Sequence, residues 1–175
     1  MSNYFYLLIG VLSKWVKKSI ERFLTRFSKL DNFVLRRVVV ENDDKLFDVN
    51  DCLRINKQTQ IPVLLDVFHH KLNNSGNLTL EESFRSTSKT WSGKRDGLPM
   101  VDYSSQEPNG SPRQHSETIK IEDFELFLKQ TEPFDFDIML EIKDKEKSAV
   151  KAIDLATKAG RIHNLLKNDL NSSVV

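Results

Sequence analysis

The chain has 175 residues, a formal net charge of +1 and one cysteine, Cys52. This length suits one domain with a substantial core, and a single cysteine excludes an internal disulfide, as is usual in a reducing compartment. The near-zero net charge excludes a strong general attraction to nucleic acid or membrane, although a local basic patch would still permit DNA binding.

The first feature along the chain is an apolar run, YFYLLIGVL, from Tyr4 to Leu12. It is shorter than the roughly 20 residues needed to cross a bilayer, and no basic segment precedes it. We therefore expect no membrane span and no secretory signal here. The run is expected to be a buried strand, or part of a segment 1–17 that is foreign to the domain, as a truncated or frame-shifted gene would produce.

Apolar runs typical of strands then alternate with amphipathic segments typical of helices. The expected strands cover 34–40, 61–70, 98–105 and 136–146. The expected helices cover 17–30, 48–56, 79–91 and 121–131, with a closing helix from about 144 to 160 and a polar tail over 161–175. Because no hairpin signal joins the strands, the pattern predicts a parallel sheet covered by helices.

Two local signals refine this pattern. Thr79 and Glu82 have the spacing of a capping box, which predicts the start of the third helix. Pro108, Gly110 and Pro112 lie in a polar stretch after the third strand, which predicts a mobile loop there.

Four acidic residues stand at or near the carboxyl ends of the expected strands, about one strand-helix unit apart: Glu41, Asp66, Asp102 and Glu141. In a parallel sheet these ends lie along one edge, so the carboxylates are expected to converge there. His69 follows Asp66 closely, and His115 lies in the loop after the third strand. One acid after a strand is also typical of a helix cap, but the repetition favours a site for Mn²⁺ or Zn²⁺.

Several strings resemble, in order and in spacing, the C-terminal half of the UV damage endonucleases. They are ENDD at 41–44, IPVLLDVFHH at 61–70, Thr90-Trp91 before a loop, and DIMLEIKDKE at 137–146. The resemblance covers about 18–155. It implies an α/β fold, the C-terminal half of a TIM barrel related to endonuclease IV and the xylose-isomerase-like barrels. We expect about four parallel strands with covering helices, over a domain of residues 18–160.

The resemblance also implies a function. This family nicks DNA 5′ to pyrimidine dimers, 6-4 photoproducts and some abasic sites, using divalent ions that are commonly manganese. It implies Mn²⁺ as cofactor, with Zn²⁺ or Mg²⁺ as alternatives, and damaged double-stranded DNA as partner. No membrane is involved, and the expected location is the cytoplasm of a bacterial-type cell, at the nucleoid.

Residue by residue, the resemblance implies the following metal ligands: Glu41, Asp66, His69, His115 and Glu141, with Asp102 as a further candidate. The carboxylates Glu41, Asp66 and Glu141 are the expected catalytic residues. A basic stretch offers three candidate contacts to DNA phosphates, Lys89, Lys94 and Arg95, although such a stretch is also typical of an ordinary solvated surface.

The chain departs from the family in two ways. Where relatives often carry Lys-x-His in the third strand, this sequence has Met100 and Asp102. It also lacks the family's first strands, with their histidines and their lesion-probing glutamine-tyrosine pair. Two alternatives therefore stand beside an endonuclease: an inactive remnant that needs a missing N-terminal half or self-association through open sheet edges, and a xylose-isomerase-like sugar isomerase or epimerase.

Overall fold

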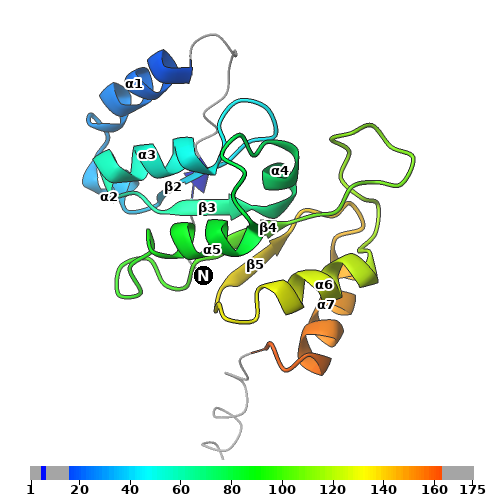
Figure 1. Cartoon of the computed structure of the whole chain (residues 1–175). Helices are drawn as coiled ribbons and strands as arrows, with labels where there is room; N and C mark the ends of the chain where they lie inside the picture. Colours follow the sequence, from blue (N-terminus) through cyan, green and yellow to red (C-terminus); the bar gives the residue numbers. More distant parts are fainter. Residues whose placement is uncertain (1–4, 7–15, 163–175) are drawn as a thin grey trace, which may run out of the picture.

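The computed structural model describes residues 5–6 and 16–162. Its centre is a parallel sheet in which five strands follow one another in sequence order (Figure 1). The strands are β1 (Phe5–Tyr6), β2 (Val38–Glu41), β3 (Val63–Asp66), β4 (Met100–Tyr103) and β5 (Asp137–Leu140). The parallel α/β architecture predicted from sequence is confirmed, and the short strand β1 lies in the apolar run 4–12, for which a strand was one of the two expectations.

Helical segments connect and cover the strands. They are α1 (Val16–Phe27), α2 (Asn32–Leu35), α3 (Val49–Thr59), α4 (Val67–Leu72), α5 (Leu80–Ser88), α6 (Ile121–Gln130) and α7 (Glu146–Lys158). The predicted capping box is present at α5, where Thr79 and Glu82 each bond the backbone of the other. No helix in the described part of the chain combines the length and apolar character that a membrane span requires.

Three of the expected strands were wrong in their bounds, and the one expected over 136–146 ends at Leu140, before α7 begins at Glu146. Val34 and Leu35 lie in α2, where their amides donate to the carbonyl of Asp31, and the strand begins only at Val38. The run 61–70 divides after Asp66, whose side chain accepts the His69 amide and so starts α4. Apolar periodicity over a short run cannot separate a buried strand from a buried helix, and the cap decides the boundary here.

Strand side chains alternate between two environments. Those facing the helices form the larger core clusters and include Val38, Val40, Val63, Leu65, Val101 and Tyr103. Those facing the opposite side, Val39, Leu64 and Met100, form a smaller apolar cluster with Trp91 from the loop after α5. Because successive strand residues point to opposite faces, Glu41, Asp66 and Asp102 continue this second row towards the carboxyl ends of their strands.

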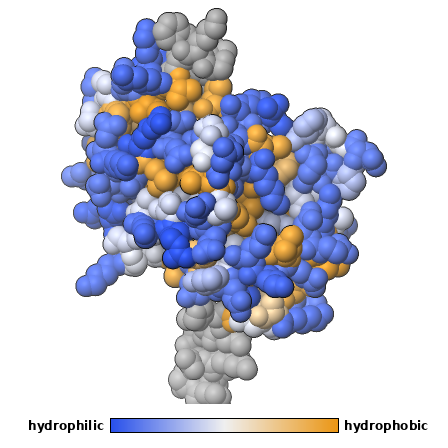
Figure 2. Space-filling model, viewed as in Figure 1, coloured by the Kyte–Doolittle hydropathy of each residue, from blue (hydrophilic) through white to orange (hydrophobic). Residues whose placement is uncertain are grey.

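The last strand leaves one side of the sheet open. β5 pairs with β4, and no other described strand pairs with it. Beside it, α7 exposes Val150 and Ile153, which are 67% and 59% accessible, and a groove around β5 and α7 is lined by apolar residues that include Ile138. In the view of Figure 2 the surface is mostly hydrophilic but is broken by apolar patches. An unpaired edge strand and exposed apolar side chains of this kind are features typical of an interaction surface.

Candidate metal centre

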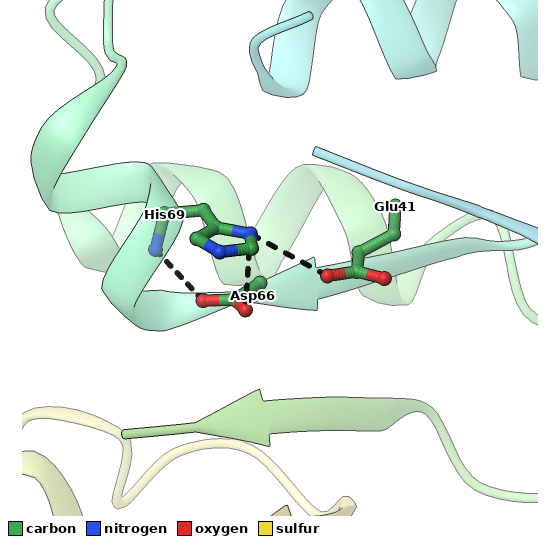
Figure 3. A group of neighbouring side chains, drawn as sticks. All are labelled: Glu41, Asp66 and His69. Atoms are coloured by element: carbon green, nitrogen blue, oxygen red, sulfur yellow. Dashed lines mark hydrogen bonds and ion pairs between the residues drawn. The ribbon is translucent and has the colours of Figure 1, made fainter. Parts of the chain in front are cut away.

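Three ligand groups meet at the carboxyl ends of β2 and β3. Glu41 ends β2, Asp66 ends β3 and His69 lies in α4, and one ligand atom from each lies within 4.8 Å of the others. The Nδ1 atom of His69 is 3.1 Å from Asp66 Oδ2 and 3.5 Å from Glu41 Oε1, so the imidazole contacts both carboxylates (Figure 3). The convergence predicted from the strand ends is therefore present for these three residues.

Asp66 orients this cluster through its two carboxylate oxygens. Its Oδ1 accepts the backbone N–H of His69 at 2.7 Å and caps α4, while its Oδ2 faces the imidazole of the same residue. The cap fixes the first turn of the helix, and that turn carries His69 back over Asp66. A helix cap and a candidate ligand are thus combined in one side chain, which is 1% exposed.

A second pair of candidate ligands lies next to the first group. His115 Nδ1 is 3.1 Å from the carbonyl oxygen of Glu141 and 3.7 Å from its Oε2. The rings of His115 and His69 meet edge to face with centroids 6.0 Å apart, and Phe68 packs edge-on against His115 at 5.1 Å. The loop that was expected to be mobile carries His115 to this place, and a bridge between Gln106 and His115 helps to hold it.

Asp102 lies on the strand beside Asp66 and has an unusual environment. It pairs in register with Asp66, is 1% exposed, and its Oδ1 finds no hydrogen-bond partner among the described residues. Burial, together with the negative charges of Glu41 and Glu141, raises the pKa of Asp102 to about 9. A buried carboxylate oxygen without a donor, surrounded by other acids, fits a place where a cation binds.

The other perturbed groups show the same crowding of charge. Burial raises the pKa of Asp66 to about 7, with the charges of Glu41 and Glu141 adding to the effect. Burial by itself would lower the pKa of His69, but its hydrogen bond with Glu41 and the charge of Asp66 outweigh this and raise the pKa to about 9. Clustered acids that hold protons at neutral pH are typical of a site that a divalent ion would neutralise.

The donor set agrees with a hard or borderline divalent ion. It offers carboxylates from four residues and imidazoles from two, a mixture that suits Mn²⁺ or Zn²⁺. Met100 packs against the apolar cluster of Val39, Leu64 and Trp91. Its side chain therefore contributes to apolar packing next to the acids and offers no carboxylate or imidazole ligand.

The basic stretch predicted to contact DNA lies at the other end of the strands. Thr90 Oγ1 accepts the N–H of Val63, and the Arg95 guanidinium donates to the carbonyl of Gln60, so the stretch packs at the amino end of β3. The structure thus places the stretch that holds Lys89, Lys94 and Arg95 away from the acids, and the contact of these three residues with DNA phosphates stays a prediction. Helix α5 runs back to the amino edge of the sheet, and the loop that follows it turns there.

The structure also shows contributors that the sequence pattern did not single out. Arg113 reaches Asp44 with a 2.7 Å ion pair, which places a cation in the loops around the carboxyl ends of the strands. The side-chain amide of Asn42 donates to the carbonyl of Asp66 and accepts the N–H of the same residue. Asn42 lies in the ENDD string, which sequence analysis singled out for its acidic residues. Nothing in the string indicates a role for the asparagine.

Comparison with known proteins identifies the relatives of this chain. A protein from Clostridium perfringens named UV DNA damage endonuclease is 36% identical over 152 residues, and one of the same name from Bacillus mycoides is 34% identical over 154 residues. A solved structure titled crystal structure of SacUVDE matches with a TM-score of 0.85 and 37% identity, covering 93% of this chain and 54% of that one. The identities support more than a shared fold.

The matches also fix the extent of the likeness. Each of the two bacterial comparisons covers 87% of this chain, which spans 37% of the Clostridium protein and 48% of the Bacillus protein. The UV-endonuclease UvdE family matches residues 2–171, a range that includes most of the segment 1–17 set apart above. Nothing in these comparisons supports the sugar-isomerase alternative, and the chain belongs to the UV-endonuclease UvdE family.

Proposed function

We propose that residues 18–160 form a metal-binding part of a UV DNA damage endonuclease, which cleaves the DNA strand 5′ to UV photoproducts. The observation that carries this proposal is the meeting of Glu41, Asp66 and His69 within 4.8 Å at the carboxyl edge of a parallel sheet. Membership of the UvdE family supports damaged double-stranded DNA as the substrate.

The proposed ligands are the six residues of the cluster, namely Glu41, Asp66, His69, Asp102, His115 and Glu141, and the proposed ion is Mn²⁺. A bound divalent ion supplies polarisation of the phosphate and activation of water. Of these ligands, Glu41, Asp66 and Glu141 are the carboxylates that we assign to catalysis.

Backbone carbonyls orient both histidines for this role. Those of Asn42 and Glu141 each lie 3.1 Å from an imidazole Nδ1, on His69 and His115 respectively. A carbonyl only accepts, so each Nδ1 carries a proton in these contacts. In His69 the same Nδ1 faces Glu41 and Asp66, so an ion held by these two carboxylates would take the place of that proton or would bind Nε2.

DNA would be held mainly through its backbone, and a damaged nucleotide is recognised at lower cost because it stacks poorly and is easier to extrude.

The open side of β5 supports a second element of the proposal. A further polypeptide, either the part of the relatives that this chain does not span or a second copy, would cover β5 and the apolar side chains Val150 and Ile153.

Calorimetry with Mn²⁺ tests the metal site directly. The wild-type chain should bind Mn²⁺, and Glu41→Gln should weaken that binding because it removes a charged ligand from the cluster. Glu117→Gln is a matched control, since Glu117 pairs with Lys143 on the surface and lies outside the cluster. Equal binding by the wild type and both variants would count against the site.

A further inference from the structure

The hydrogen-bonded pairing of β2 with β3 ends before Asp66, the candidate ligand on β3. Its last paired residues are Glu41 and Leu64, and β3 continues to Asp66. At that point the side chain of Asn42 takes over from the backbone of β2. Its Nδ2 donates to the carbonyl of Asp66 at 3.0 Å, and its Oδ1 accepts the N–H of Asp66 at 3.0 Å.

The chemistry of a carboxamide explains why asparagine stands here. Its side chain presents both a donor and an acceptor, as a peptide group does, whereas an ionised aspartate only accepts and alanine does neither. Asn42 is fully buried, so no solvent replaces these two hydrogen bonds when the amide is lost. The residue therefore acts as an additional rung that joins the end of β2 to the end of β3.

This rung connects three of the candidate ligands. It fixes the backbone of Asp66, it follows Glu41 directly in the chain, and its own carbonyl oxygen lies 3.1 Å from Nδ1 of His69. We propose that Asn42 is a positioning residue of the metal centre, which sets the spacing of Glu41, Asp66 and His69 without binding the ion itself. The inference rests on the proposed function, because it assumes that these three residues hold a divalent ion.

The test compares Asn42→Ala with Asn73→Ala in the full 175-residue chain. Asn73 is a matched control because its Nδ2 also donates to a backbone carbonyl at 3.0 Å, that of Asp43. Its only bond to a ligand residue runs from its backbone N–H to the carbonyl of His69, and an alanine at this position keeps that N–H. Mn²⁺ affinity is measured by calorimetry, and urea unfolding in EDTA records stability separately. Residues that orient metal ligands typically affect affinity by about 10- to 100-fold, and we expect a loss of this size for Asn42→Ala.

Asn73→Ala should keep the wild-type affinity, whatever its effect on stability. Unchanged Mn²⁺ affinity in Asn42→Ala, with binding still lost in Glu41→Gln, would overturn the role of Asn42 and leave the metal site standing. Failure of the wild-type chain to bind Mn²⁺ would overturn the proposed site and this inference with it.

Hydrogen exchange of the wild-type chain provides a measurement that needs no variant to fold. The amide of Asp66 should exchange as slowly as the central amides of β3 without metal, because it donates to Asn42, and more slowly still when Mn²⁺ is added. An Asp66 amide that exchanges at the rate of a surface loop, or that does not respond to Mn²⁺, would overturn the inference.

Discussion

Replacing Asp102 with asparagine should stabilise the metal-free protein at neutral and alkaline pH while weakening its binding of Mn²⁺. Asp102 is 1% exposed, and burial with the charges of Glu41 and Glu141 raises its pKa from 3.8 to about 9. The folded state therefore keeps a proton that the unfolded chain releases above pH 3.8. The stability associated with this proton is complete below that pH and is lost as the pH rises towards 9.

The size of the effect follows from the pKa. Each pKa unit corresponds to about 1.4 kcal/mol, so at pH 7 the buried carboxyl lowers the stability of the fold by at most about 4 kcal/mol. The amide that replaces it brings a buried polar group of its own, which costs about 1–3 kcal/mol if unpaired. A net gain of about 2 kcal/mol remains, and in a protein of this size it raises the melting temperature by about 4 to 8 °C.

The assay is urea unfolding of wild type and Asp102→Asn in EDTA at a series of pH values between about 4 and 9, spanning the unfolded and folded pKa of the carboxyl, repeated with Mn²⁺. At the acid end the variant should be the less stable protein by about 1–3 kcal/mol, because only the cost of the buried amide remains there. The difference should move in favour of the variant as the pH rises, and it should shrink or reverse when Mn²⁺ is present. Asp137→Asn, on the exposed amino end of β5, serves as the control and should show no such trend. A variant that is destabilised equally at every pH would refute the reasoning.

The remaining predictions concern the metal, the reaction and the core. Glu141→Gln should reduce the binding of Mn²⁺ in calorimetry, and tight binding that ignores the substitution would contradict the assignment of this residue. The 175-residue chain alone should not nick UV-irradiated plasmid with Mn²⁺ at a useful rate, because it spans under half the length of its bacterial relatives. Adding the N-terminal half of the Clostridium relative should restore nicking that depends on Glu141, and robust nicking by the chain alone would show that the missing part is dispensable. Phe84→Ala should lower the free energy of unfolding by about 3–5 kcal/mol, because it empties a buried site in the core. Phe84 is 1% exposed and packs against Phe127, Phe134 and Phe136, so a loss in urea unfolding near zero would contradict that packing.

The sequence by itself determined the order of strands and helices and the edge at which the acids gather. Apolar runs without hairpin turns imply a parallel sheet, and the carboxyl ends of parallel strands share one edge whatever the details of packing. Asp66 and Asp102 are therefore expected side by side from their positions in the chain, and the register of β3 and β4 confirms this. The capping box at Thr79 and Glu82 is equally accessible from sequence, because it depends on residues three apart in the chain.

Tertiary structure decided what depends on partners far apart in the sequence. The burial of Asp102 and its unpartnered oxygen arise from neighbours on other strands, and the role of Asn42 arises only because the β2 ladder ends before Asp66. The basic stretch around Arg95 is a candidate for DNA contact from its sequence, and only the bond of Arg95 to Gln60 shows that it lies at the opposite edge from the acids. Local patterns indicate which face or end of an element a residue occupies. The distances between elements are set by register, loop paths and packing, and these determine which side chains form the site.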